Sequence, residues 1–111
     1  MAKLLVVGGD LVGGVAALIL RSNFEEVAET SHDSALEMFL AEEPTHVIIF
    51  DYIEGGDGKA KWCRGRVTWQ DIKSSADPGQ VIVRCGFPRY DYPDYIQLPL
   101  QLDDLLKLLG V

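Results

Sequence analysis

The chain has 111 residues and a mass of 12.3 kDa, which allows one domain over residues 1–111 and leaves too little length for two. Its hydrophobic fraction of 48% and charged fraction of 24% are those of a globular protein, so an intrinsically disordered chain is excluded. The formal net charge of −7 disfavours nucleic acid as a partner, because a phosphate backbone would repel this surface.

Apolar runs in the sequence are short. The longest, residues 11–20 (LVGGVAALIL), has about half of the roughly 20 residues that a membrane helix needs, and no basic start precedes it as in a secretion signal. Cys63 and Cys85 are too few for a disulfide framework and lack the spacing of metal ligands. We therefore expect a cytoplasmic protein with no membrane contact.

The first elements are a strand and a helix. Residues 3–9 (KLLVVGG) form a short apolar run ended by glycines, which predicts a buried strand. Residues 10–23 follow with apolar side chains at helical spacing and with Asp10 as the helix cap. Gly13 and Gly14 are expected to weaken this helix by about 1 kcal/mol each relative to alanine.

A second strand and a second helix come next. Residues 24–30 (FEEVAET) predict the strand. Ser34 followed by Glu37 is the pattern of a capping box, and it predicts a helix that Pro44 stops. A buried third strand, residues 46–51, then delivers Asp51 to the edge of the sheet.

Residues 59–76 are ambiguous, since they fit one helix or a loop followed by a short helix. Trp62 and Trp69 are seven residues apart and could share one helix face. Beyond the turn that Pro78 marks, the remaining elements are clearer. They are strands at 80–86 and 95–100 and a closing helix at 101–111.

Strands that alternate with helices predict an α/β fold with a parallel sheet covered on both faces. Ligands of such sheets bind at the carboxyl ends of the strands. The residues expected to meet at this edge are Gly8, Gly9, Asp10, Asp51, Cys85, Leu98 and Pro99. They define the candidate strand-end pocket.

Two long segments, together with KLLVVGG (residues 3–9) at the start, carry a family resemblance that covers most of the chain. Residues 24–52 resemble the second strand, second helix and third strand of a two-component receiver domain, with Asp51 in the place of the phosphorylated aspartate. Residues 94–109 (DYIQLPLQLDDLLKLL) are similar to the last strand and helix of that family. The resemblance implies a flavodoxin-like three-layer fold with a five-stranded parallel sheet in the order 2-1-3-4-5.

The active site of that family is incomplete here. Gly8 and Gly9 stand where receivers carry the acidic pair that holds Mg²⁺, and only Asp10 could supply a carboxylate. Leu98 replaces the family's lysine and Cys85 its hydroxyl residue. We therefore predict a pseudo-receiver that acts without phosphorylation and without a cofactor. The alternative is phosphorylation of Asp51, with Mg²⁺ bound by Asp51 and Asp10.

The neighbours of Cys85 also depart from the family. Arg84 could bring a positive charge to the strand ends, but strand alternation places it on the face opposite Cys85. Between the fourth and fifth strands, FPRYDYP leaves room only for a shortened or missing fourth helix. Tyr90, Tyr92 and Tyr95 suit either a contact patch or a loop packed on the sheet. A protein partner, kinase or effector, is expected, and a homodimer stays open.

Two other classes of protein, a nucleotide-binding protein and an enzyme, fit the sequence less well. The turn VVGGDLVGG matches a dinucleotide-binding pattern at Gly8 and Gly13, with Glu29 placed as a ribose-binding acid, but Asp10 replaces the central glycine and would repel a pyrophosphate. A small Rossmann-like nucleotide-binding protein is kept as an alternative. An enzyme is not predicted, because neither His32 nor His46 is placed to act as a base for a cysteine.

Overall fold

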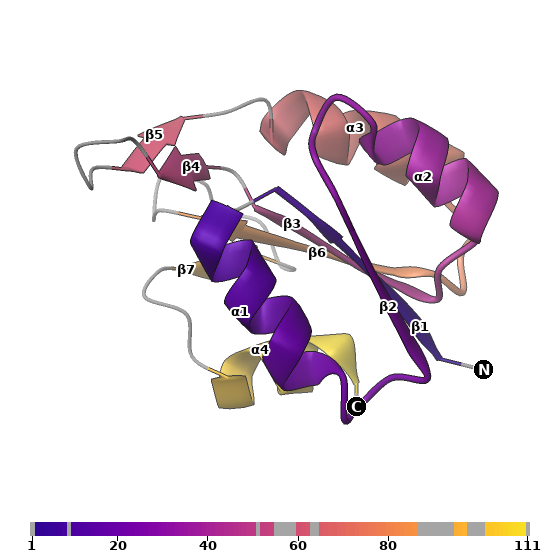
Figure 1. Cartoon of the computed structure of the whole chain (residues 1–111). Coiled ribbons are helices and arrows are strands. Elements are labelled where there is room, and N and C mark those ends of the chain that lie inside the picture. The colour runs from indigo at the N-terminus through magenta and orange to yellow at the C-terminus, as the bar shows by residue number, and fades with distance from the viewer. Residues whose placement is uncertain are drawn as a thin grey trace.

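The computed structural model describes residues 2–8, 10–50, 52–54, 60–62, 65–86, 95–97 and 102–110. Strands and helices alternate along most of this length, as Figure 1 shows. The elements are β1 (Lys3–Val7), α1 (Asp10–Leu20), β2 (Glu26–Thr30), α2 (Ala35–Glu42), β3 (His46–Phe50), β4 (Tyr52–Glu54), β5 (Ala60–Trp62), α3 (Gly65–Ser75), β6 (Val81–Gly86), β7 (Tyr95–Gln97) and α4 (Leu102–Leu109).

The main sheet is parallel and has the strand order β2-β1-β3-β6. This confirms the predicted α/β class and the predicted parallel order 2-1-3-4. At the next position, the three residues of β7 pair in parallel with the end of β6, where a strand over 95–100 was predicted. The segment between β6 and β7, for which a shortened or missing helix was predicted, lies outside the described residues.

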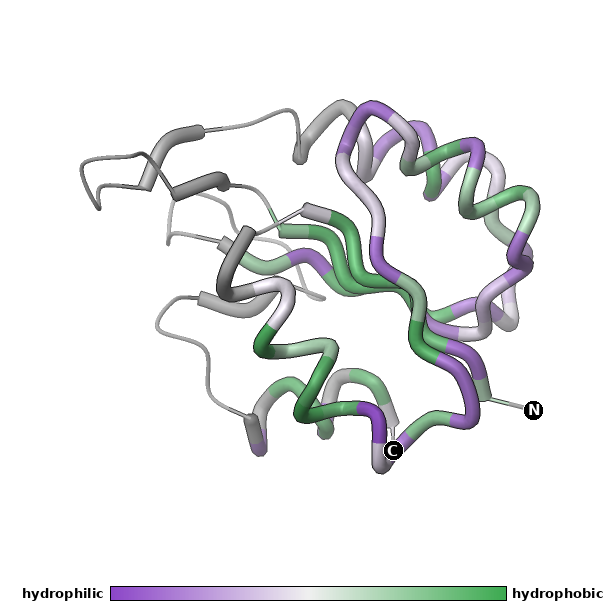
Figure 2. Tube along the Cα trace, viewed as in Figure 1, coloured by the Kyte–Doolittle hydropathy of each residue, from purple (hydrophilic) through white to green (hydrophobic). Residues whose placement is uncertain are grey.

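Helices cover both faces of the sheet: α1 and α4 lie on one face, and α2 and α3 lie on the other (Figure 1). Strand β3 shows how the sequence builds both cores. Val47 and Ile49 join the cluster under α2 and α3, whereas Ile48 and Phe50 join the cluster under α1 and α4. All four are fully buried, and each burial stabilises the fold by about 1.5–3 kcal/mol. The hydrophobic strands lie between the helices in Figure 2.

An antiparallel hairpin of β4 and β5 was not predicted. It pairs Tyr52–Glu54 with Ala60–Trp62, and α3 follows at Gly65. Trp62 therefore belongs to a strand and Trp69 to a helix, so the prediction of a shared helix face was wrong. Strands of three residues are too short for an alternating pattern to reveal them.

The ends of the helices agree with the sequence only in part. Helix α1 runs from Asp10 to Leu20, where a helix over 10–23 with Asp10 as its cap was predicted, and α2 ends just before Pro44 with Glu43 in the left-handed conformation at φ 48°. The capping box is wrong, because Ser34 makes no capping hydrogen bond through its side chain. Within the described ranges, no helix is both long and apolar enough to cross a lipid bilayer.

Candidate functional site

An imidazole ring closes the carboxyl end of β1. Gly8 follows this strand with φ 71° and donates its backbone N–H to the carbonyl oxygen of Thr30 at 2.9 Å. A Cβ atom on residue 8 would lie 2.7 Å from Cδ2 of His32 and nearer still to Nε2. Residue 8 therefore offers an L side chain neither a relaxed backbone conformation nor space.

His32 is held in this position from helix α3. Its Nδ1 lies 2.9 Å from Oγ1 of Thr68, a residue that is 6% exposed. The hydrogen bond joins the connection between β2 and α2 to a helix 36 residues later in the chain. No local sequence pattern relates residue 32 to residues 8 and 68, so this positioning role was missed.

Near its carboxyl end, strand β6 carries two buried side chains that face opposite sides of the sheet. Arg84 is fully buried, and its Cζ lies 5.6 Å from the ring centroid of Trp69, within the range of a cation–π interaction. Cys85 is fully buried in the other cluster, which α1 and α4 cover. The expectation that Arg84 faces away from Cys85 is confirmed. Arg84 thus places a cation on the α2 and α3 face of the sheet.

The turn from β1 into α1 depends on a second glycine. A Cβ atom on Gly13 would overlap the backbone carbonyl oxygen of Gly8. Helix α1 can therefore approach the end of β1 this closely only because residue 13 has no side chain. The neighbouring Gly14 differs, since a Cβ atom there would be 3.7 Å from Oε1 of Glu29, an ordinary contact.

A cavity of about 350 Å³ opens where β1 and β2 end. It is lined by Val6, Gly8, Glu29, Thr30 and Ser31. The Glu29 carboxylate is half exposed and lies 3.9 Å from Nη2 of Arg21, a long ion pair near the surface. The cavity therefore brings the Glu29 carboxylate beside Gly8, whereas the Thr30 side chain, one residue along the strand, points to the opposite face and donates its hydroxyl to the carbonyl oxygen of Ser31.

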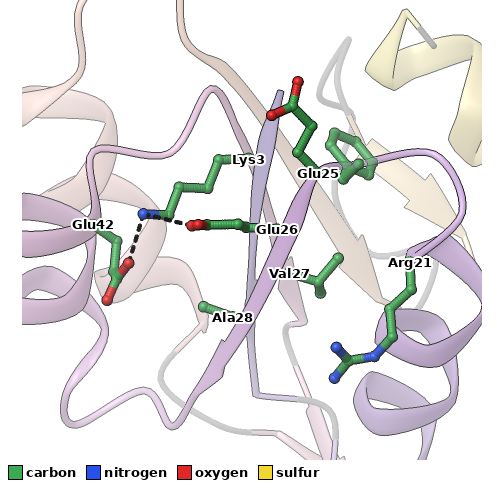
Figure 3. Close-up of a pocket in the computed structure, with 8 residues that line it drawn as sticks. Lys3, Arg21, Glu25, Glu26, Val27, Ala28 and Glu42 are labelled. Atoms are coloured by element: carbon green, nitrogen blue, oxygen red, sulfur yellow. Dashed lines mark ion pairs between the residues drawn. The ribbon is translucent and has the colours of Figure 1, made fainter. Parts of the chain in front are cut away.

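A second hollow, of about 390 Å³, lies along the open edge of β2 and reaches the amino end of the sheet (Figure 3). Its lining residues are Lys3, Arg21, Phe24, Glu25, Glu26, Val27, Ala28 and Glu42. Lys3 Nζ lies 2.7 Å from Glu42 and 3.1 Å from Glu26, and these hydrogen bonds raise the pKa of the Lys3 ammonium. Since Lys3 already has two anionic partners, we interpret this hollow as structural.

Most of the predicted pocket lies where the structure gives no description. Gly9, Asp51, Leu98 and Pro99 are outside the described residues, as are Tyr90 and Tyr92. Asp10 is the first residue of α1, and Tyr95 is the first residue of β7. Gly8 and Cys85 do lie at the carboxyl ends of β1 and β6, the edge predicted for both.

His46 lies at the other end of the sheet, as predicted. Its ring meets Phe24 edge to face at 5.0 Å between centroids, and burial lowers the pKa of the imidazole.

In the part of the chain described, no three His, Cys, Asp or Glu side chains gather as a metal site would require. No family model matches this sequence, and no curated protein is similar enough to count as a relative.

Proposed function

We propose that this chain is a receiver-like module of cytoplasmic signal transduction that recognises a protein partner without being phosphorylated. The parallel order β2-β1-β3-β6, with helices on both faces, is compatible with the flavodoxin-like fold of receivers. In this proposal β7 is the fifth strand, which gives the order 2-1-3-4-5. The choice of receivers rests on the resemblance of residues 24–52 and 94–109 to that family.

The closed end of β1 carries the proposal. Receivers place a metal-binding carboxylate there, and in this chain the position is Gly8 with the ring of His32 packed over it. Phosphoryl transfer to an aspartate gathers negative oxygens that need Mg²⁺ and a fixed cation to compensate their charge. A site without that carboxylate is poorly suited to the transfer, which favours a function through surface recognition.

The alternative is that Asp51 accepts a phosphoryl group from a kinase, with Mg²⁺ between Asp51 and Asp10. Beryllofluoride with Mg²⁺ mimics a phosphoryl group on an aspartate and tests this directly. We expect no change in the amide NMR signals of Gly8, His32 or Cys85, because the mimic needs the same metal as the phosphate does. A conventional receiver domain in the same buffer is the positive control. Shifts that require both reagents and vanish in Asp51→Asn would establish the alternative instead.

Helix α1 offers a surface for the partner. It carries no charged residue from position 11 to 20, and its outward side exposes Val15 (47%), Leu18 (70%) and Ile19 (46%). A helix that is apolar on all sides is normally covered. Beside α1, the adjacent strand β2 presents the half-exposed carboxylate of Glu29, whereas Glu26 lies on the α2 face in an ion pair with Lys3. We therefore infer that α1 binds a partner helix with an apolar face and basic flanks.

Leu18→Ser is expected to abolish binding of that partner while changing the free energy of unfolding by less than about 0.5 kcal/mol, because Leu18 is mostly exposed. Leu40→Ser is the matched control, since Leu40 is 59% exposed on α2 at the opposite face of the sheet. When each variant is immobilised, Leu40→Ser should retain one protein that elutes at raised salt, and Leu18→Ser should not retain it. Equal retention by both variants would contradict the assignment. A wild-type dimer that Leu18→Ser converts to a monomer would make α1 a self-interface instead.

A further inference from the structure

The cavity at the ends of β1 and β2 has no part in the proposed signalling function. It lies at the carboxyl edge of a parallel sheet, where α/β proteins bind small ligands. Its volume of about 350 Å³ is at the lower end of the range for ligand sites. It is large enough for a nucleoside and too small for a dinucleotide.

The glycines of the adjacent turn act as those of a nucleotide-binding turn do. Gly8 supplies the positive φ of a tight strand-to-helix turn, and Gly13 lets α1 pack directly on that turn. Asp10 occupies the central position, at the first residue of α1, where such turns let a pyrophosphate approach. Gly8 and Gly13 therefore match the outer glycines of such a turn, and the sequence has an acid at the position where the phosphates would bind.

The carboxylate of Glu29 supplies the recognition group. Glu29 lines the cavity near the end of β2, and its carboxylate is half exposed. Two oxygens of a carboxylate can accept hydrogen bonds from the neighbouring hydroxyl groups of a ribose ring, and such charge-assisted bonds are strong. With the Glu29 carboxylate in its lining and a net charge of −7 on the chain, the site disfavours an anionic ligand.

We propose that this cavity binds the ribose of an uncharged nucleoside, with Glu29 accepting hydrogen bonds from the 2′ and 3′ hydroxyl groups. The site lies on described residues, and it does not depend on the signalling function proposed above. It accounts for the glycine pattern of this turn, which has Gly8 and Gly13 at its ends but Asp10 where phosphates would approach.

The first experiment is a titration of isotope-labelled protein with adenosine, followed by amide NMR. We expect shifts at Gly8, Thr30 and Ser31, and binding that is about tenfold weaker for 2′-deoxyadenosine, which lacks one of the two hydroxyl groups. Adenosine monophosphate should bind more weakly than adenosine. The absence of shifts, or tighter binding of the monophosphate, would overturn the proposal. If free ribose bound as tightly as adenosine, the base would not contribute to binding, and the ligand would not be a nucleoside.

The second experiment uses variants. Glu29→Gln keeps the shape of the side chain but removes the charge, and it should weaken adenosine binding about tenfold or more. Glu25→Gln is the matched control, because Glu25 is exposed, lies just before the same strand and lines the other hollow. Equal affinity in the two variants would remove Glu29 from the site. Thermal unfolding of both verifies that the fold is unchanged.

Discussion

Replacing Gly8 with alanine is expected to lower the free energy of unfolding by about 2–4 kcal/mol. Part of this loss comes from the backbone, because residue 8 has φ 71°, a conformation that costs an L residue about 1–2 kcal/mol. The rest comes from the new Cβ atom, which must displace the His32 ring and break its hydrogen bond to Thr68. Urea denaturation of both proteins measures the difference.

The control and a second variant separate the two causes. Gly79→Ala should change stability by no more than about 0.5–1 kcal/mol, because Gly79 has no positive φ and a Cβ atom there meets nothing within 4 Å. In a His32→Ala background, Gly8→Ala should lower the free energy of unfolding only by the backbone part of its cost. The double-mutant cycle then gives a coupling energy above about 0.5 kcal/mol. Strict additivity would show that His32 does not close the end of β1.

The same geometry bears on whether the receiver chemistry can be restored. Under the receiver-like function proposed above, Gly8→Asp would place a carboxylate where receivers bind Mg²⁺, but its side chain would meet the same ring and require the same positive φ. The His32 ring, which Thr68 holds in place, therefore leaves no space for an acidic side chain at residue 8. Under the same proposal, Gly8→Asp alone would not create a metal site unless the His32 ring also moved.

The layered fold could be predicted because its signals are local. Apolar runs such as residues 46–50 are long enough to identify buried strands, and alternation with helices then dictates parallel crossovers. The short hairpin β4–β5 carried no such signal, since each of its strands has three residues. The capping pattern at Ser34 was present in the sequence, yet the side chain does not make the bond.

The candidate site was harder to predict because its contacts are long-range. Gly8, His32 and Thr68 come from three separate connections or helices, and only the folded sheet brings them together. Burial of Arg84 against Trp69 is similar, since an arginine in a strand gives no indication that its charge will be enclosed. The proximity of Gly8 and Glu29 was foreseeable in part, because both end adjacent strands of the predicted sheet.

Adjacent glycines in α1 are expected to respond to alanine with opposite signs. Gly14→Ala should raise the free energy of unfolding by about 0.5–1 kcal/mol, the usual gain inside a helix, because its Cβ atom finds an ordinary contact distance to Glu29. Gly13→Ala should lower it by about 2–4 kcal/mol, because its Cβ atom would overlap the carbonyl oxygen of Gly8 and push α1 away from β1.

The two variants share helix, neighbourhood and substitution, so the comparison cancels helix propensity and isolates the approach of α1 to the turn. Chemical denaturation gives both values on one scale. If the two variants were equally stabilised, α1 would not pack on the end of β1 as closely as described, and the glycine turn would lose its structural basis. A large loss in Gly13→Ala alone would show that residue 13 fixes the position of α1.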